Sequence, residues 1–195
     1  DTILIEWGSL LLRWAHLIAG IYWIGSSFYF MHIDAALKAS PDIPEGTGGE
    51  AWEVHGGGFY HVRKYLVAPD RLPAELIWHK WQSYATWITG FFLLVWIYYL
   101  SADLFMIDPA VRQLSVGAAA SIGLMTLGLG WLAYDLLCRS AVGKHEGWLG
   151  MAVFLLVILV TALLGEVFSG RGTLIHVGAM IATWMTGNVL LVIIP

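Results

Sequence analysis

The sequence is poor in charged residues, and this scarcity decides its class. Of its 195 residues only 12% are charged, whereas 58% are hydrophobic and the mean hydropathy is +0.72. Soluble domains carry about 25% charged residues. Lys and Arg total 10 against 14 Asp and Glu, and the absence of a basic run excludes nucleic-acid binding. The high hydrophobicity also excludes a disordered chain. We therefore expect an integral membrane protein.

Cysteine is almost absent, since Cys138 is the only one. One cysteine cannot form a disulfide framework or a cysteine-based zinc site, and it cannot supply the Cys-x-x-Cys-His motif that attaches a c-type haem.

Long apolar runs are abundant, and a helix needs about 20 apolar residues to cross a bilayer. Strict apolar/polar alternation is missing, which excludes a porin-like barrel. We predict an all-α integral membrane protein with about five transmembrane helices in a single domain. The predicted spans are residues 8–31, 81–100, 115–137, 148–168 and 174–194.

Basic residues gather on one side of this predicted topology. The segment between the first two spans contains five Lys or Arg, and the short loop after the third span adds Arg139 and Lys144. The loops of the opposite side contain only Arg112 and Arg171. Because cytoplasmic loops are enriched in Lys and Arg, we expect the long loop in the cytoplasm and the N-terminus on the outer side.

The long loop, residues 34–80, is predicted to have structure of its own. Turn-forming residues fill positions 40–49, and alternating residues on both sides of Gly56-Gly57-Gly58 indicate a short β-hairpin with a glycine turn. Residues 70–75, with Pro73 near the first turn, are typical of the start of a helix. Structured loops of this length are usually functional.

Ionisable residues inside a membrane span are functional candidates by default. Arg13 and His16 lie one turn apart in the first span, and His176 lies near the outer end of the fifth. Two histidines on the same side of the membrane, with Gly20 and Gly178 nearby, could form a slot for a b-type haem, with Arg13 meeting a propionate. Alternatively, each histidine hydrogen-bonds a neighbouring helix. Met180 is either a competing ligand or ordinary packing.

The hairpin carries a second set of candidates. His55 and His61 flank the glycine turn, with Tyr60 and Arg63 close by. Three interpretations stay open. Glu53, His55 and His61 could bind a metal, although their spacing matches no standard zinc pattern. The aromatic residues Trp52, Phe59 and Tyr60 could instead stack on a planar polar molecule, or the hairpin could rest on the membrane with its aromatic side chains at headgroup level.

Two smaller features concern the third span. Its glycines, at positions 117, 123, 128 and 130, allow close approach of a neighbouring helix. Asp135 and Arg139 are four residues apart and are predicted to form a pair on one helix face.

Several of these runs together resemble one known family. They are Leu12–His16, Trp23–Phe30, Gly48–Tyr60, Tyr65–Pro69, Gly130–Asp135, Val167–Gly172 and His176–Met180. The chain resembles the bacterial membrane-bound urate hydroxylase (urate oxidase) family over nearly its whole length, and the glycine-turn motif is a specific match.

The resemblance implies a multispan domain of the bacterial inner membrane, followed by a periplasmic cytochrome c domain, and the charge bias then makes the outer side of the N-terminus periplasmic. It further implies oxidation of urate to 5-hydroxyisourate, with electrons passed to that cytochrome c. The chain lacks Cys-x-x-Cys-His, and the family's membrane domain continues through further spans, so we expect either the first part of such a domain or a relative that has lost the rest. We assign substrate to the hairpin, with His55, Tyr60, His61 and Arg63 as catalytic candidates. The haem site of His16, His176 and Arg13 would carry electrons outward.

Two other functions stay open. One is a haem b electron-transfer subunit of a larger respiratory or photosynthetic membrane complex, which predicts a b-type spectrum without urate-dependent reduction. The other is a structural or transport subunit without a cofactor, which predicts no Soret band. Both place the chain in the lipid bilayer beside other membrane subunits.

Overall fold

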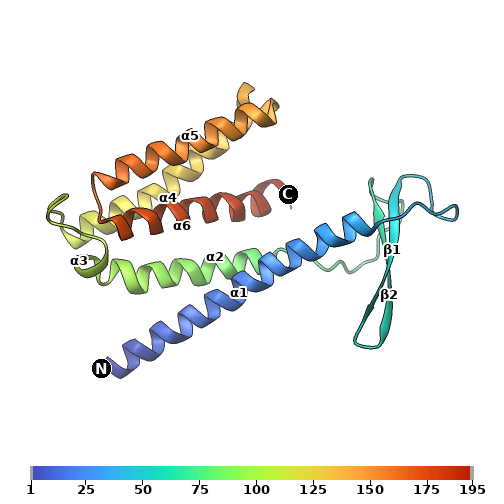
Figure 1. The fold of residues 1–195 in the computed structure, drawn as a ribbon, viewed down its shortest axis with the longest axis horizontal. Helices are drawn as coiled ribbons and strands as arrows, with labels where there is room; N and C mark the ends of the chain where they lie inside the picture. The colour runs from blue at the N-terminus through green and yellow to red at the C-terminus, as the bar shows by residue number, and fades with distance from the viewer. Residues whose placement is uncertain (1, 194–195) are drawn as a thin grey trace. The chain divides into compact units, whose positions relative to one another are not determined.

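The computed structural model describes residues 2–193, which are mostly helical and include one two-stranded sheet (Figure 1). The chain separates into two compact units. The first contains residues up to 20 and from 80 onward, and the second contains residues 21–79. Helix α1 (Thr2–Ala36) contributes its N-terminal part to the first unit and its C-terminal part to the second.

The first unit is a helical bundle. Helix α2 (Trp81–Leu94) continues directly as a π-helix, η1 (Val95–Tyr99), and the short helix α3 (Ala102–Phe105) follows. The remaining elements are α4 (Val116–Arg139), the 3₁₀ turn η2 (Ala141–Lys144), α5 (Glu146–Gly165), α6 (Gly170–Asn188) and a second π-helix, η3 (Val189–Ile193).

Serine caps set where two of these helices begin. The Ser115 hydroxyl accepts a hydrogen bond from the Ala118 amide at 3.2 Å, and the Ser169 hydroxyl accepts one from the Gly172 amide at 3.1 Å. Each bond satisfies an amide that has no partner within the helix. The cap at Ser169 explains why α6 begins at residue 170, four residues before the predicted span 174–194. The predicted pair is also present, with Arg139 Nε donating to Asp135 Oδ2 at 2.7 Å.

Helix α6 is the central element of the bundle and packs against α2, α4 and α5. The buried core includes Leu94, Leu127, Leu164 and Phe168. Among residues 2–193, three helices are long and apolar enough to cross a membrane: α4, α5, and α6 extended by η3. They coincide with the last three predicted spans. The first two, 8–31 in α1 and 81–100 in α2 and η1, stay predictions.

The second unit contains the predicted β-hairpin. Strand β1 (Thr47–His55) pairs antiparallel with β2 (Gly58–Tyr65), and His55 lies opposite Gly58. The two residues between them, Gly56 and Gly57, have φ of 58° and 81°. Positive φ at both central residues defines a type I′ turn, which glycine adopts without steric cost and whose twist matches that of the strands. The register places Trp52 opposite His61 and Glu50 opposite Arg63.

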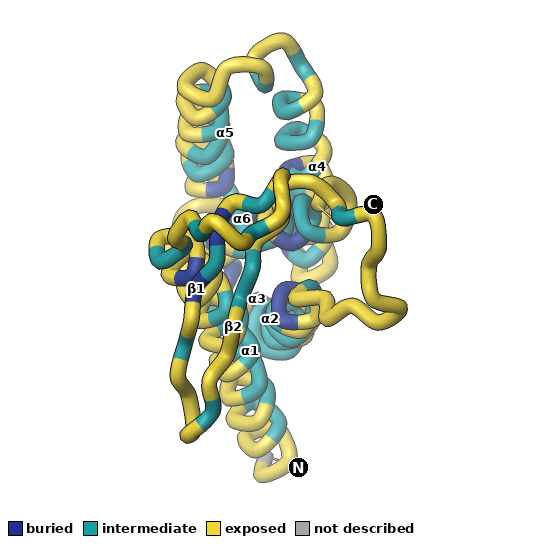
Figure 2. Tube along the Cα trace, turned by 90° about the vertical axis from the view of Figure 1, so that its right-hand side faces the viewer, coloured by how far each residue is buried: buried dark blue, intermediate teal, exposed yellow. Residues whose placement is uncertain are grey.

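The hairpin is joined to the C-terminal part of α1. The Tyr29 hydroxyl donates to Glu53 Oε2 at 2.6 Å, and Lys64 Nζ donates to Asp34 Oδ1 at 2.7 Å. Ile33 of α1 is buried. Most of the hairpin is nevertheless exposed (Figure 2).

The prediction of a helix start at residues 70–75 is wrong. The described chain forms no helix between Tyr65 and Trp81. Leu72, Leu76 and Ile77 are exposed by 56%, 45% and 90%. A short helix is marginal in water unless an apolar face packs against something, and these side chains have no such surface to pack on.

Candidate functional site

The outer face of the hairpin carries a cluster of three polar side chains. Glu50 Oε2 accepts hydrogen bonds from His61 Nε2 at 2.9 Å and from Arg63 Nη2 at 3.2 Å. The Trp52 indole stacks on the His61 ring, with the centroids 4.3 Å apart and the planes inclined by 13°. The I′ turn fixes the cross-strand pairing, so these four side chains share one face. The Trp52 indole therefore lies beside a carboxylate and two nitrogen donors.

The electrostatics of this cluster favour its charged form. Partial burial alone would raise the pKa of the Glu50 carboxyl, but the hydrogen bonds from Arg63 and His61 outweigh it and hold that pKa below its ordinary value. The pKa of the Arg63 guanidinium is raised, first by its hydrogen bond to Glu50 and then by one to Tyr65. Arg63 is thus held between two side chains of the same face.

The structure divides the four predicted catalytic candidates between two faces. His61 and Arg63 belong to the outer face. Tyr60 pairs with Glu53 in the register, and His55 lies two residues from Glu53 on the same strand, so these residues occupy the face that meets Tyr29 of α1. Successive strand residues point to opposite sides of a sheet.

The same alternation contradicts the metal site predicted at Glu53, His55 and His61. Glu53 and His55 share one face of β1, whereas His61 projects from the other face. Three ligands must converge on one point to hold an ion. Among the described residues no group of three or more His, Cys, Asp or Glu side chains is placed to bind a metal.

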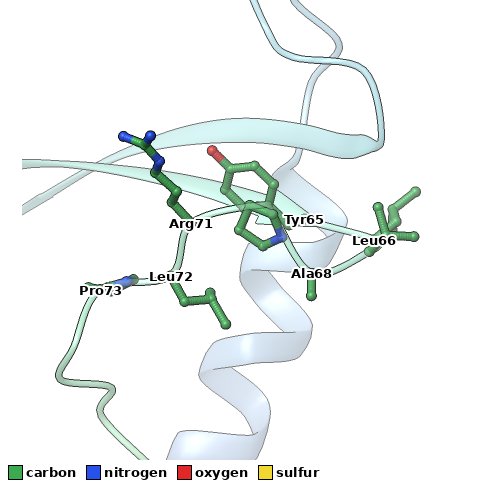
Figure 3. A pocket seen from close by; sticks show the side chains of 8 residues that line it. Tyr65, Leu66, Ala68, Arg71, Leu72 and Pro73 are labelled. Carbon is green, nitrogen blue, oxygen red and sulfur yellow. The ribbon is translucent and has the colours of Figure 1, made fainter.

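A pocket of about 540 Å³ adjoins the cluster, where β2 ends and the chain turns back (Figure 3). Tyr65 and residues 66–69 line one part of it, and Arg71, Leu72 and Pro73 line the rest. Tyr65 also raises the pKa of the Arg63 guanidinium, so the pocket lies beside the polar cluster. Together they form a surface that contains the Trp52 indole, the pocket with its apolar side chains, and the guanidinium groups of Arg63 and Arg71.

Glu50 and Trp52 complete this surface, although only the second was considered from the sequence. The signal for Glu50 was present: a two-residue turn at Gly56-Gly57 sets the pairing and places Glu50 opposite Arg63. Assigning the turn type would have found it. Tyr65 and the pocket depend on the irregular chain after β2, for which the sequence has no comparable signal.

His16 lies against α2 in the first unit. Its Nδ1 is 3.1 Å from the Thr86 carbonyl oxygen and 3.2 Å from the Thr89 hydroxyl. A carbonyl oxygen only accepts, so Nδ1 carries the proton. A Cβ added to Gly90 would lie 2.8 Å from Cε1 of the His16 ring, so this contact requires a glycine. Arg13, one turn earlier on α1, is exposed.

His176, on α6, is fully buried where α6 meets η1 and α4. Its Nδ1 donates to the Gly172 carbonyl oxygen at 2.7 Å, and its Nε2 lies 3.2 Å from the Tyr99 hydroxyl. A Cβ on Gly123 of α4 would lie 2.5 Å from Nε2. In the neutral ring Nε2 accepts from Tyr99, so both ring nitrogens have a partner within the protein.

Of the two glycines predicted beside the histidines, Gly20 faces α2, where its Cβ would lie 4.0 Å from Thr86 Cγ2, but Gly178 faces no neighbouring helix. Nothing lies within 4 Å of a Cβ on Gly178, which is exposed. Gly178 follows His176 by two residues and therefore points to another side of α6. Gly90 and Gly123, on the neighbouring helices, provide the close approach instead. Met180 is fully buried against Gly130, which is packing.

Comparison with known protein families gives one match. The family model described as "Urate oxidase N-terminal" matches residues 2–195. Neither the comparison with curated proteins nor the comparison with solved structures gives a match.

Proposed function

The chain belongs to the urate oxidase N-terminal family, and from this premise we propose that it is the membrane part of an oxidoreductase that oxidises urate. The observation that carries the proposal is the extent of the family match, which reaches from residue 2 to residue 195. The three apolar helices that are able to cross a membrane are compatible with this setting.

The proposed reaction converts urate and water to 5-hydroxyisourate. Urate loses two electrons and two protons, and the oxygen of water becomes the new hydroxyl group. The electrons pass one at a time to a c-type cytochrome, so two molecules of oxidised cytochrome are reduced for each urate. We place the hairpin in the cytoplasm and the N-terminus in the periplasm, in agreement with the bias of Lys and Arg between the loops.

The outer face of the hairpin supports urate recognition because its chemistry is complementary to a planar anion. Urate offers carbonyl oxygens and ring N–H groups around a flat bicycle. The guanidinium of Arg63 and the imidazole of His61 are donors, and the Glu50 carboxylate is an acceptor for an N–H group. Trp52 is 68% exposed beside them, which leaves its indole available for stacking.

Steady-state kinetics on the full-length protein test both parts of this proposal. The assay follows urate-dependent reduction of an added c-type cytochrome by the protein in membranes. Arg63→Gln removes a charged donor from the outer face, whereas Lys64→Gln removes a neighbouring charge on the opposite face and serves as the matched control. Charged hydrogen bonds are worth about 1.5–3 kcal/mol, so kcat/KM of Arg63→Gln is expected to fall roughly 10- to 100-fold, and that of Lys64→Gln by less than about threefold.

The outcomes separate the activity from its location. Absence of urate-dependent cytochrome reduction in the wild-type protein contradicts the proposed reaction. Equal rates for Arg63→Gln and Lys64→Gln, with an active wild type, contradict the assignment of the hairpin and leave the reaction standing.

A second candidate function is electron transfer through a b-type haem held by His16 and His176. In its favour, each Nδ1 is held by a carbonyl oxygen, an arrangement that leaves Nε2 as the basic nitrogen of a ligating histidine. Against it, the Tyr99 hydroxyl and Gly123 occupy the space in front of His176 Nε2. A porphyrin does not fit at His176 in this packing, and no step of the proposed reaction passes through haem.

A further inference from the structure

The turn end of the hairpin carries an apolar patch on its outer face. Val54 lies opposite Phe59 in the register, and Trp52 follows on the same face toward the polar cluster. Their exposed fractions are 69%, 78% and 68%. We refer to these three residues as the tip patch. Large side chains grouped in this way on a narrow hairpin are unfavourable in water and indicate a surface that is covered in the working protein.

The turn end of the patch, formed by Val54 and Phe59, has no formally charged residue between its two members. Residues 54–59 comprise Val54, His55, three glycines and Phe59, and His55 projects from the opposite face. The ionic groups of the hairpin, including Glu50 and Arg63, lie farther from the turn. The hairpin therefore has an apolar end and a charged base, which is the polarity of an element that dips into a bilayer surface.

Two hydrogen bonds within the second unit set the direction of the hairpin relative to α1. Lys64, at the base, bonds Asp34 near the end of the helix. Glu53, nearer the turn, bonds Tyr29, which is five residues earlier in α1. Five helical residues span about 7.5 Å. Moving along the hairpin toward its turn therefore means moving back along α1, toward residues 8–31, where the sequence predicts a membrane span.

The helix surface at this level has the same character. Phe28 and Tyr29 of α1 are exposed by 64% and 46%. Aromatic side chains at the end of a span lie at the boundary between headgroups and acyl chains. The tip patch reaches back toward this aromatic level.

We propose that the turn end of the tip patch, Val54 and Phe59, inserts into the boundary between headgroups and acyl chains of the bilayer that α1 leaves at this point. Trp52, which stacks on His61, stays on the aqueous side beside the polar cluster. The inserted turn, together with the end of α1, then holds the hairpin at two points. The cluster of Glu50, His61 and Arg63 faces the aqueous side.

Spin labels on the full chain in phosphatidylcholine–phosphatidylglycerol vesicles test this insertion. In a Cys138→Ser background, single cysteines are introduced as Phe59→Cys, Val54→Cys and Asp42→Cys, and each is labelled with a nitroxide. Asp42 is exposed in the loop before β1 and is the control in water. Collision rates are measured with oxygen, which concentrates in acyl chains, and with a neutral nickel chelate, which stays in water.

The ratio of oxygen to nickel collisions is expected to be several-fold higher at positions 54 and 59 than at position 42. An equal ratio at all three positions would place the tip patch in water and overturn the proposal. Low rates with both reagents at 54 and 59 would show cover by protein, such as a second copy of the chain, and would equally overturn it. The measurement requires no urate, so its outcome is independent of the proposed reaction.

Discussion

The hydroxyl of Tyr99 lies 3.2 Å from Nε2 of His176 and connects the π-helix at the end of α2 to the central helix α6. The bond is buried, and Gly123 of α4 closes its third side. Three segments that are far apart in the sequence therefore meet at one imidazole ring.

Replacing Tyr99 with Phe removes the hydroxyl but keeps the ring. The buried Nε2 of His176 then loses its partner, and we expect a loss of about 1 kcal/mol in the free energy of unfolding. The measurement is denaturant or thermal unfolding in detergent. Tyr98→Phe is the matched control, because Tyr98 lies one residue away and its ring contacts Phe105 at a tilt of 57°. Equal stability of the two variants would contradict a role for the Tyr99 hydroxyl.

Gly123→Ala adds a methyl group where no space exists. The new Cβ would lie 2.5 Å from His176 Nε2 and 2.8 Å from the Tyr99 hydroxyl. We expect overpacking to cost about 1–3 kcal/mol, measured as a lower unfolding midpoint. Gly128→Ala is the control on the same helix, since nothing lies within 4 Å of its Cβ. That variant should be neutral or more stable by up to about 1 kcal/mol, because alanine is the better helix former.

The pH dependence of stability should reveal how much the Glu50 carboxylate contributes to the free energy of unfolding. The hydrogen bonds of Arg63 and His61 hold its folded-state pKa below the ordinary value, which is about 4.3 for an unfolded chain. The stabilisation that the ionised Glu50 carboxylate provides is therefore fully present above about pH 4.3. It disappears as the pH falls through the lower pKa of the folded state. Urea midpoints measured across this interval should fall more steeply for the wild type than for Glu50→Gln. Glu45→Gln, in the exposed loop, should keep the wild-type slope.

Removing both bonds between the hairpin and α1 should loosen the hairpin without unfolding the bundle. Tyr29→Phe and Asp34→Asn each break a partly exposed contact worth at most about 1 kcal/mol. We expect the double variant to show faster amide hydrogen exchange in β2 and unchanged exchange in α4 and α6. Tyr22→Phe, on an exposed part of α1, is the control. Faster exchange throughout the protein would mean that the two units are not independent.

Local signals predicted much of this fold. The apolar runs located α4, α5 and α6 to within a few residues, and Gly56-Gly57 located the hairpin turn, because both depend on neighbouring residues only. The partners of His16 and His176 could not be predicted in this way. Gly90 and Gly123 matter because of which helix lies beside which, and a single sequence carries little information about helix pairing.

The site shows the same division. His61 and Arg63 were recognised as polar residues near the turn, but their grouping with Glu50 required the strand register. His55 and Tyr60 were placed with them because proximity in sequence does not distinguish the two faces of a strand. The helix expected after residue 70 failed for a related reason, since its apolar residues had no surface to pack on.

The π-helix Val95–Tyr99 has a consequence for how the bundle tolerates changes in chain length. The Leu100 amide bonds the Val95 carbonyl oxygen five residues back, so this turn accommodates one residue more than an α-helical turn. If the same residues formed an α-helical turn instead, everything that follows would be rotated by about 100°. Tyr99 would then turn away from His176. The direction of the Tyr99 side chain therefore depends on the one extra residue that the π-helical turn contains.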